Sequence, residues 1–469
     1  MIVPSAIDIS ATSTSSQPSI SARPLTFVLF ASASHSRPQL TIVQDEEDYY
    51  PAYANAEQKE IETLSQKINN AALEAHAMAI RPGILCHASP LRFDKHTKHE
   101  IMGGMNVHVN VEFKDGITWL ARIRRSNATT PPPILRDHII LSEYATLQFL
   151  ENVNVPTPKL LGYALEAEKG NNVGVEYMFI EKLPGKPLHW TQATEEQKRK
   201  IIRKLADHSI ELAKRPLQKI GSFDRIGSQH IGPTAIEEFT DITDGVMRAL
   251  GPFTSMRECY TAYLHEILER ILTCQLYTHH ALDAYLIHRF LLDLTEQVWP
   301  VEEEGGKTYL NHADDKGNHI LIDNDYTITG MIDWGWAFSA PRTLSFNSPL
   351  VLLDIPEFYA GDPAISSAES YFAHALERKG GMGLAESARG GRKRRFFEFC
   401  CGYDVYTDWE GLFELFGGLR RCVGGYGELQ WEEWRKIALE RYEDDQGVLQ
   451  LMVCDVEVQE LADAGEDNG

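Results

Sequence analysis

The chain has 469 residues, of which 43% are hydrophobic and 24% charged, the balance of a globular protein with a real core. This length suits two or three domains, or one large unit of two lobes. Acidic residues outnumber basic ones 67 to 45, giving a formal net charge of −22. Because binders of nucleic acid or anionic membranes need an excess of Lys and Arg, we expect neither kind of partner.

The cysteines and the start of the chain indicate a cytoplasmic protein. Seven cysteines are scattered without a C-x-x-C pair, so neither a zinc ribbon nor a thioredoxin-like site is indicated, and reduced thiols are expected. The apolar stretch Leu25–Ala31 is far shorter than the roughly 20 residues that a membrane helix needs. It also lies too deep in the chain for a secretory signal peptide.

The first half of the chain predicts a leader and then a small lobe that contains a sheet. Residues 1–45 are rich in Ser, Thr, Ala and Pro, which indicates a flexible leader. Residues 46–185 form the predicted N-lobe, in which helical and alternating patterns follow one another. Its expected elements are a helix at Asn55–Ala79, a hairpin of His108–Phe113 and Trp119–Ile123 around Lys114-Asp115-Gly116, a helix at Asp137–Leu150 and a buried strand at Glu176–Glu181.

The second half predicts a larger, mainly helical lobe at residues 186–455, followed by an acidic tail at residues 456–469. Its expected elements are helices at Glu195–Ala213, Arg257–Cys274 and Tyr277–Val298, strands within Tyr309–Trp336, and further helices to about Tyr442. The order indicates an α+β chain of two lobes, which is suited to a site in the cleft between them.

The chemistry is concentrated in residues 310–334. A polar loop carrying Asp314 precedes a short apolar strand, Ile320–Ile322, and after a turn a second strand, Ile328–Ile332, ends at Asp333. A hairpin of this kind brings the loop acid and the strand-end acid to the same end. Two carboxylates there suit a divalent cation and an acceptor hydroxyl, as phosphoryl transfer requires. The alternatives are an Asp314 that caps its own loop and an Asp333 that only ends a strand.

This segment resembles a known family. The runs His312-Ala313-Asp314, Ile320–Asp323 and Gly330–Trp334 are similar to the core of the aminoglycoside phosphotransferases, within the wider phosphotransferase enzyme family, including fungal-type members. The resemblance covers roughly residues 85–345 and implies a bilobal protein-kinase-like fold with a small antiparallel sheet in the N-lobe. It implies ATP or GTP with Mg²⁺ as cofactors and a small-molecule hydroxyl as acceptor. Asp314 would orient that hydroxyl and Asp333 would bind the metal.

Two positions depart from the family pattern. The family's second metal ligand is an Asn five residues after the catalytic Asp, whereas here that position holds His319, directly after Asn318. Mg²⁺ prefers oxygen ligands, so His319 leaves Mn²⁺ as an alternative metal. Ala313 replaces the family's Gly, a milder change. Two functions therefore stay open: a phosphotransferase, or a catalytically impaired pseudokinase that binds a nucleotide or a partner.

The resemblance also assigns nucleotide-binding residues in the small lobe. Gly103-Gly104 resembles the loop that covers the phosphates, and Arg122 stands where kinases place the strand-three lysine, with Glu143 as its helix partner. The run Phe179–Leu188 resembles the hinge between the lobes, where Ile180 to Leu183, which include Glu181, would supply backbone groups to the base. The alternatives without a function are a plain turn at Gly103-Gly104, a solvated strand Arg122 with an unrelated helix Glu143, and a simple strand-to-turn connection at the hinge.

Several further features receive no catalytic role. We interpret Arg389–Arg395 as a solvated loop that opens a helix at Phe396, with a nuclear address or a phosphate-binding patch as alternatives. Gly221-Ser222 is similar to related fungal sequences, without an assignable chemistry. No motif specifies the acceptor, ATP over GTP, or the oligomeric state.

Overall fold

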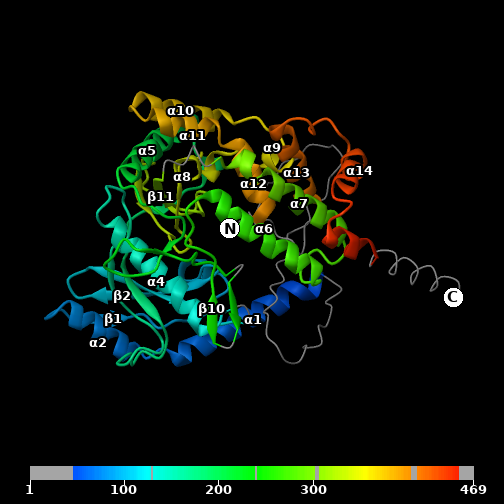
Figure 1. The fold of residues 1–469 in the computed structure, drawn as a ribbon. Coiled ribbons are helices and arrows are strands. Elements are labelled where there is room, and N and C mark those ends of the chain that lie inside the picture. Colours follow the sequence, from blue (N-terminus) through cyan, green and yellow to red (C-terminus); the bar gives the residue numbers. More distant parts are fainter. Residues whose placement is uncertain are drawn as a thin grey trace.

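The computed structural model describes residues 46–127, 130–237, 240–243, 245–300, 306–402 and 409–453. They form a smaller lobe built on an antiparallel sheet and a larger, mainly helical lobe (Figure 1). The predicted bilobal α+β fold is confirmed. The predicted leader and acidic tail lie outside the described residues, and the predicted lobe boundaries remain predictions.

The N-lobe sheet has five antiparallel strands in the order β1-β2-β3-β5-β4. In β2 the side chains at Val107, Val109, Val111 and Phe113 are buried and alternate with more exposed ones, which is the pattern of a strand with one face on the core. The strands are β1 (Cys86–Ala88), β2 (Asn106–Phe113), β3 (Thr118–Arg124), β4 (Leu160–Ala164) and β5 (Tyr177–Glu181).

Four helices accompany this sheet: α1 (Glu46–Lys67), α2 (Asn70–Ile80), the short α3 (Lys98–Ile101) and α4 (Pro133–Leu150). The prediction of one continuous helix over Asn55–Ala79 was wrong. The Asn69 side chain accepts the backbone N–H of Ala72 at 3.2 Å and so begins a second helix. Helix α4 is fixed to the sheet by Tyr144, whose buried hydroxyl donates to the carbonyl of Tyr177 at 3.0 Å.

The chain passes between the lobes through a segment that lies on the predicted catalytic hairpin. Strand β6 (Lys186–Pro187) pairs with β12 (Ile320–Ile322), which in turn pairs with β13 (Ile328–Met331). Gly185 precedes β6 at φ +114°, and a Cβ there would meet Thr329 Oγ1 and, at 2.9 Å, the carbonyl oxygen of Ile322. The connection therefore fits against the hairpin only without a side chain at residue 185.

The large lobe is held by one extensive core between α6, α7 and the C-terminal helices. Helix α7 begins at Ala281, later than predicted, because Tyr277 has φ +52° and cannot belong to a right-handed helix. The other elements are α5 (Glu195–Ala213), β7 (Ser222–Phe223), β8 (Ile231–Gly232), β9 (Asp241–Thr243), β10 (Val246–Arg248), α6 (Met256–Leu272), α7 (Ala281–Val298), β11 (Thr308–Asn311), β14 (Phe338–Pro341), α8 (Arg342–Ser345), α9 (Ile355–Tyr359), α10 (Ser367–Arg378), α11 (Met382–Arg389), α12 (Arg392–Gly402), α13 (Trp409–Val423) and α14 (Trp431–Arg441).

The basic run at residues 389–395 was misinterpreted as a solvated loop. Helix α12 already begins at Arg392, and Arg392, Arg394 and Arg395 are each at most 9% exposed. Arg392 forms a buried ion pair with Glu369 at 2.7 Å, while Arg394 lies over the ring of Trp299. Buried guanidinium groups need carboxylate, carbonyl or aromatic partners. These contacts therefore tie α12 to the elements that carry Glu369 and Trp299.

None of the described helices combines the length and the apolar character that crossing a membrane requires.

Substituting Gly185 tests how tightly the inter-lobe segment is fitted. We expect Gly185→Ala to lower the free energy of unfolding by about 2–4 kcal/mol, since a positive φ and a clash add. Gly83→Ala is the matched control, because Gly83 has φ +85° but no atom near its would-be Cβ. It should cost about 1 kcal/mol. Equal losses in urea denaturation would contradict the tight fit.

Candidate active site

His312 ties the loop that carries Asp314 to the hairpin of β12 and β13. Its Nε2 lies 2.9 Å from the carbonyl oxygen of Ile332, and its Nδ1 lies 3.4 Å from the backbone nitrogen of Asp314. A carbonyl only accepts and an amide only donates, so Nε2 carries the proton and Nδ1 is the acceptor. One imidazole thus ties the loop that carries Asp314 to the residue before Asp333. The rings of His312 and Trp334 are in contact, with centroids 4.4 Å apart.

Arg122 joins two of the predicted site residues from different lobes. Its guanidinium forms an ion pair with Glu143 of α4 through Nη1, and Nη2 donates to Asp333 Oδ1 at 2.9 Å. The side chains of Arg122 and Glu143 are 10% and 9% exposed, whereas Asp333 is 43% exposed. The predicted pairing of strand arginine and helix glutamate is therefore present, and it extends to Asp333.

Two residues of β2 complete the surroundings of Arg122. Asn106, with its amide oxygen toward the guanidinium, accepts from Nε at 3.2 Å and from Nη2 at 2.7 Å. His108 faces Arg122 in the sheet register. Burial and then the Arg122 charge lower the pKa of His108 to about 4, so this imidazole is neutral at pH 7. Sequence reasoning gave neither residue a role, although their alternate spacing on β2 could have placed both beside the strand arginine.

Asp314 has a cation of its own. Lys316 Nζ lies 3.2 Å from Asp314 Oδ1, and the side chains are 17% and 7% exposed. Burial raises the pKa of Asp314, and the Lys316 ammonium opposes this rise. The ion pair thus helps to keep an enclosed carboxylate ionised. Lys316 was missed from the sequence, where only its position two residues after Asp314 pointed to it.

His319, the predicted alternative metal ligand, is buried at 3% exposure. Its Nδ1 accepts the backbone N–H of Gly317 at 3.3 Å, which leaves the proton on Nε2 of the neutral ring. Burial, followed by the nearby His312 and Lys316, lowers the pKa of His319 well below its usual range. Its ring packs against that of His312, with centroids 4.3 Å apart. Metal coordination through Nε2 would require the proton to move and the Gly317 contact to break.

The residues of the predicted phosphate loop and hinge make contacts of their own within the protein. The carbonyls of Gly103 and Gly104 accept from Arg125 Nη1 at 3.2 and 3.3 Å, and both glycines are exposed. The Glu181 N–H donates to the carbonyl of Lys159 at 3.0 Å. The Leu183 side chain packs over Gly330 of β13, where a Cβ would come within 2.7 Å of it. Whether these groups contact a nucleotide stays a prediction.

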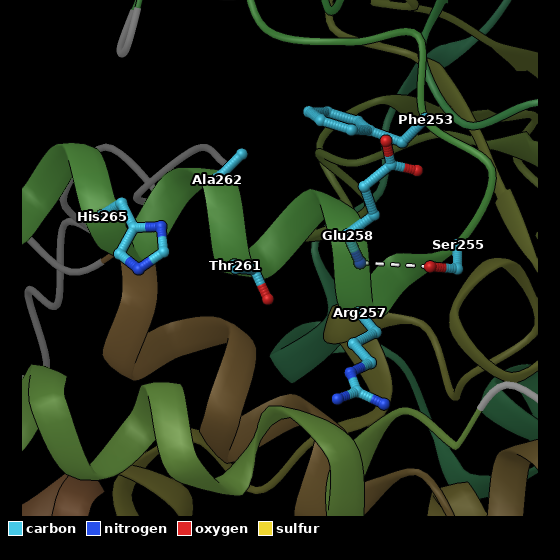
Figure 2. Close-up of a pocket in the computed structure, with 7 residues that line it drawn as sticks. All are labelled: Phe253, Ser255, Arg257, Glu258, Thr261, Ala262 and His265. Atoms are coloured by element: carbon cyan, nitrogen blue, oxygen red, sulfur yellow. Dashed lines mark hydrogen bonds between the residues drawn. The ribbon is translucent and has the colours of Figure 1, made fainter.

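A surface hollow elsewhere does not coincide with these residues. It is lined by the start of α6 and the loop before it (Figure 2): Phe253, Ser255, Arg257, Glu258, Thr261, Ala262 and His265. Glu258 accepts from the N–H and hydroxyl of Thr254 at 2.9 and 2.8 Å, and Arg257 pairs with Glu296 at 3.1 Å. These charges already have partners within the protein. Among the described residues, no group of three or more His, Cys, Asp and Glu side chains could by itself hold a metal ion.

The contribution of the buried Arg122–Glu143 ion pair to stability can be measured. We expect Glu143→Gln to lower the free energy of unfolding by about 1–3 kcal/mol, because Arg122 would keep only Asp333 as a charged partner. Glu377→Gln is the control, since its partner Arg389 is 42% exposed, and it should have a much smaller effect on stability because solvent screens the pair. Equal effects in chemical denaturation would mean that the Arg122 pair contributes no more than a surface pair.

The half-buried His108, with its lowered pKa, predicts acid sensitivity. Its pKa of about 4 lies below the value of 6.5 for an unfolded chain, so the unfolded state binds more protons between these values. The free energy of unfolding should fall as pH drops from 6.5 towards 4, by on the order of 3 kcal/mol from this residue. His108→Gln should flatten the profile, whereas replacing the exposed His265 by Gln should not. An unchanged slope in His108→Gln would refute this assignment.

Comparison with known proteins identifies the family. Residues 106–346 match the model of the phosphotransferase enzyme family. No curated protein sequence matches the chain. Similar solved structures include a GDP complex of wild-type aminoglycoside 2'-phosphotransferase-IIIa, with 16% identity, a TM-score of 0.40, and coverage of 75% of this chain and 97% of that one. A thermostable mutant of aminoglycoside phosphotransferase APH(4)-Ia, in a ternary complex with ADP and hygromycin B, has 15% identity, a TM-score of 0.41, and coverage of 74% of this chain and 96% of that one.

The macrolide 2'-phosphotransferase MphH from Brachybacterium faecium gives 15% identity, a TM-score of 0.39, and coverage of 75% of this chain and 98% of that one. The family match is the stronger result, because it spans just over half of the chain and includes Arg122, Glu143, Asp314 and Asp333. The chain belongs to the phosphotransferase enzyme family.

Proposed function

We propose that the protein transfers a phosphoryl group from ATP or GTP to a hydroxyl group of a small molecule. The observation that carries this proposal is the ion-pair network in which Arg122 contacts both Glu143 and Asp333. A buried cation between two acids, at the junction of sheet and hairpin, suits the phosphates of a nucleotide. Membership of the family supports phosphoryl transfer as the reaction.

The roles of the residues follow from their surroundings. Asp314 is the candidate that orients and deprotonates the acceptor hydroxyl, because Lys316 at 3.2 Å favours its ionised form. Arg122 is the candidate contact to the phosphates, with Glu143 and Asn106 fixing its plane. Catalysis would rest on positioning and charge neutralisation, without a covalent intermediate. Gly103, Gly104, Glu181 and Leu183 are proposed to surround the nucleotide.

The residues present partly fit a divalent cation. Asp333 offers a 43% exposed carboxylate, the type of oxygen ligand through which Mg²⁺ is held together with substrate phosphates. Such an ion would neutralise charge on the phosphates. His319 fits less well, since it is buried and its Nδ1 already accepts a hydrogen bond. Asp333 is therefore the ligand that we propose, with Mg²⁺ or Mn²⁺ as the metal.

His319 also favours a second candidate function, a pseudokinase that binds a nucleotide or a partner without turnover. A neutral, enclosed imidazole replaces the amide of the family pattern, so one oxygen ligand is lost. In addition, the Asp333 carboxylate is already engaged by Arg122. Both features weaken a metal site without removing the nucleotide contacts.

Thermal melting tests nucleotide binding directly. The protein should be melted with ATP or GTP, each with Mg²⁺, with Mn²⁺ and without metal. A ligand at about 100 times its Kd stabilises the native state by roughly 2.7 kcal/mol, a shift of several degrees. We expect a metal-dependent shift that Asp333→Ala abolishes and that Asp325→Ala, a change in the exposed turn of the same hairpin, retains. Absence of a shift with every nucleotide would refute the proposed function.

Restoring the family amide separates the two candidate functions. We expect His319→Asn to raise the rate of phosphate release from ATP and Mg²⁺ by about tenfold or more, because an amide oxygen suits Mg²⁺ better than an imidazole. His279→Asn, at an exposed site, should leave the rate unchanged. An already active enzyme that does not respond would mean that His319 is tolerated, and a variant that stays inactive would favour the pseudokinase.

A further inference from the structure

Residues 220–237 contact both α4, which carries Glu143, and β14, which follows Asp333. None of these residues contacts Arg122 itself as a partner in its ion-pair network. It follows α5 and includes the Gly221-Ser222 pair, which the sequence left without a role. In Figure 1 the chain that follows α5 reaches the hairpin β9–β10, which lies beside α4 of the N-lobe. We call residues 220–237 the brace.

One end of the brace is fixed to β14, a few residues beyond Asp333. Gly221 donates to the carbonyl of Ser339 at 3.3 Å, and the Ser339 N–H donates back to Gly221 at 2.7 Å. Gly221 has φ +150°, and a Cβ there would collide with the carbonyl oxygen of Gly232. The turn is closed internally by Ser222, whose hydroxyl accepts the N–H of Ala235 at 3.0 Å. This glycine is thus required by a close backbone approach.

The remainder of the brace packs on α4. Ala235 forms a buried cluster with Leu135 and Ile139, against which Ile242 and Met247 of the hairpin also pack. Leu135 and Ile139 precede Glu143 by eight and four residues, so all three lie along one face of the helix. The brace therefore contacts the same helical face that presents Glu143 to Arg122, one and two turns earlier.

Further contacts fix the other end of α4 and the neighbouring strand. The ring of Phe223 lies against that of Phe149, with centroids 5.0 Å apart, and the Gly227 N–H donates to the Gln148 side chain. Glu237 pairs with Arg124, which lies two residues after Arg122 on the same face of β3. The Glu237 carboxylate thereby neutralises a buried cation that would otherwise repel Arg122.

We propose that the brace is a positioning element that holds α4 and the segment after Asp333 in one fixed relation, so that Glu143 and Asp333 reach Arg122 together. One short segment hydrogen-bonds β14 and packs on α4, and a rigid link between two packed elements transmits displacement from one to the other. The proposal rests on the proposed function only in taking the Arg122 network as the phosphate site. Its structural part concerns the ligand-free protein.

Hydrogen exchange of the full-length, ligand-free protein tests that structural part. Glu237→Ala and, as a milder change, Gln148→Ala should each loosen the brace. We expect exchange to accelerate in α4 and also at Ile332 and Ala337, whose amides donate to His319 and Trp334, by about tenfold. Glu166→Ala is the matched control, since it removes a carboxylate from Arg136 of α4 away from the brace. It should leave Ile332 and Ala337 unchanged.

Binding of ATP with Mg²⁺ supplies the second readout. Each brace variant should weaken the Kd about tenfold, and in the Glu143→Gln background the same change should have little further effect, because the positioned group is already lost. Additive effects, or faster exchange confined to the brace and α4, would overturn the proposal. Wild-type protein that binds neither ATP nor GTP would instead refute the proposed function, and the exchange result would still decide on the brace. If Glu237→Ala does not fold, Gln148→Ala decides alone.

Discussion

The structure depends on the burial of one guanidinium group. Arg122 is 10% exposed, and moving an unpaired cation into such a place costs several kcal/mol. Glu143 from α4, Asp333 at the end of the β12–β13 hairpin and Asn106 from β2 together compensate that cost. Asn106 and Glu143 lie in the same lobe as Arg122, whereas Asp333 lies in the larger lobe, so the Arg122–Asp333 ion pair links the two lobes. Arg suits this position better than Lys, since its planar fork reaches several acceptors at once.

The sequence was most informative where chemistry and local pattern coincide. Helix α5 was predicted at its observed bounds, and the resemblance to the family pattern pointed to the Arg122–Glu143 pair, which the structure contains. The two wrong predictions have different causes, one long-range and one local. The three buried cations of α12 look like a solvated run, and only tertiary packing supplies the partners that bury them. The break at Asn69 was missed because one cap can interrupt a continuous helical pattern.

Residues that act through others were the hardest to find. Lys316 and His312 stand beside Asp314 in the chain, yet only the fold gives them partners: an ion pair for one and the Ile332 carbonyl for the other. Asn106 is 16 residues from Arg122 in sequence and becomes its neighbour through the β2–β3 hairpin. A sequence pattern identifies groups that carry charge or a motif, whereas neutral groups that orient them are specified by register and rotamer.

Backbone conformation shows how the loops around the site are strained. Ala313 and Asp333 have φ of +67° and +65°, a region where a Cβ costs about 1–2 kcal/mol. The family pattern has Gly at the position of Ala313, so this conformation explains the glycine and makes its replacement less mild than the sequence indicated. At residue 333 a glycine would remove the carboxylate that pairs with Arg122 at 2.9 Å. His312 supports both of these strained residues, because its two hydrogen bonds hold the loop that contains Ala313 against the strand end that precedes Asp333.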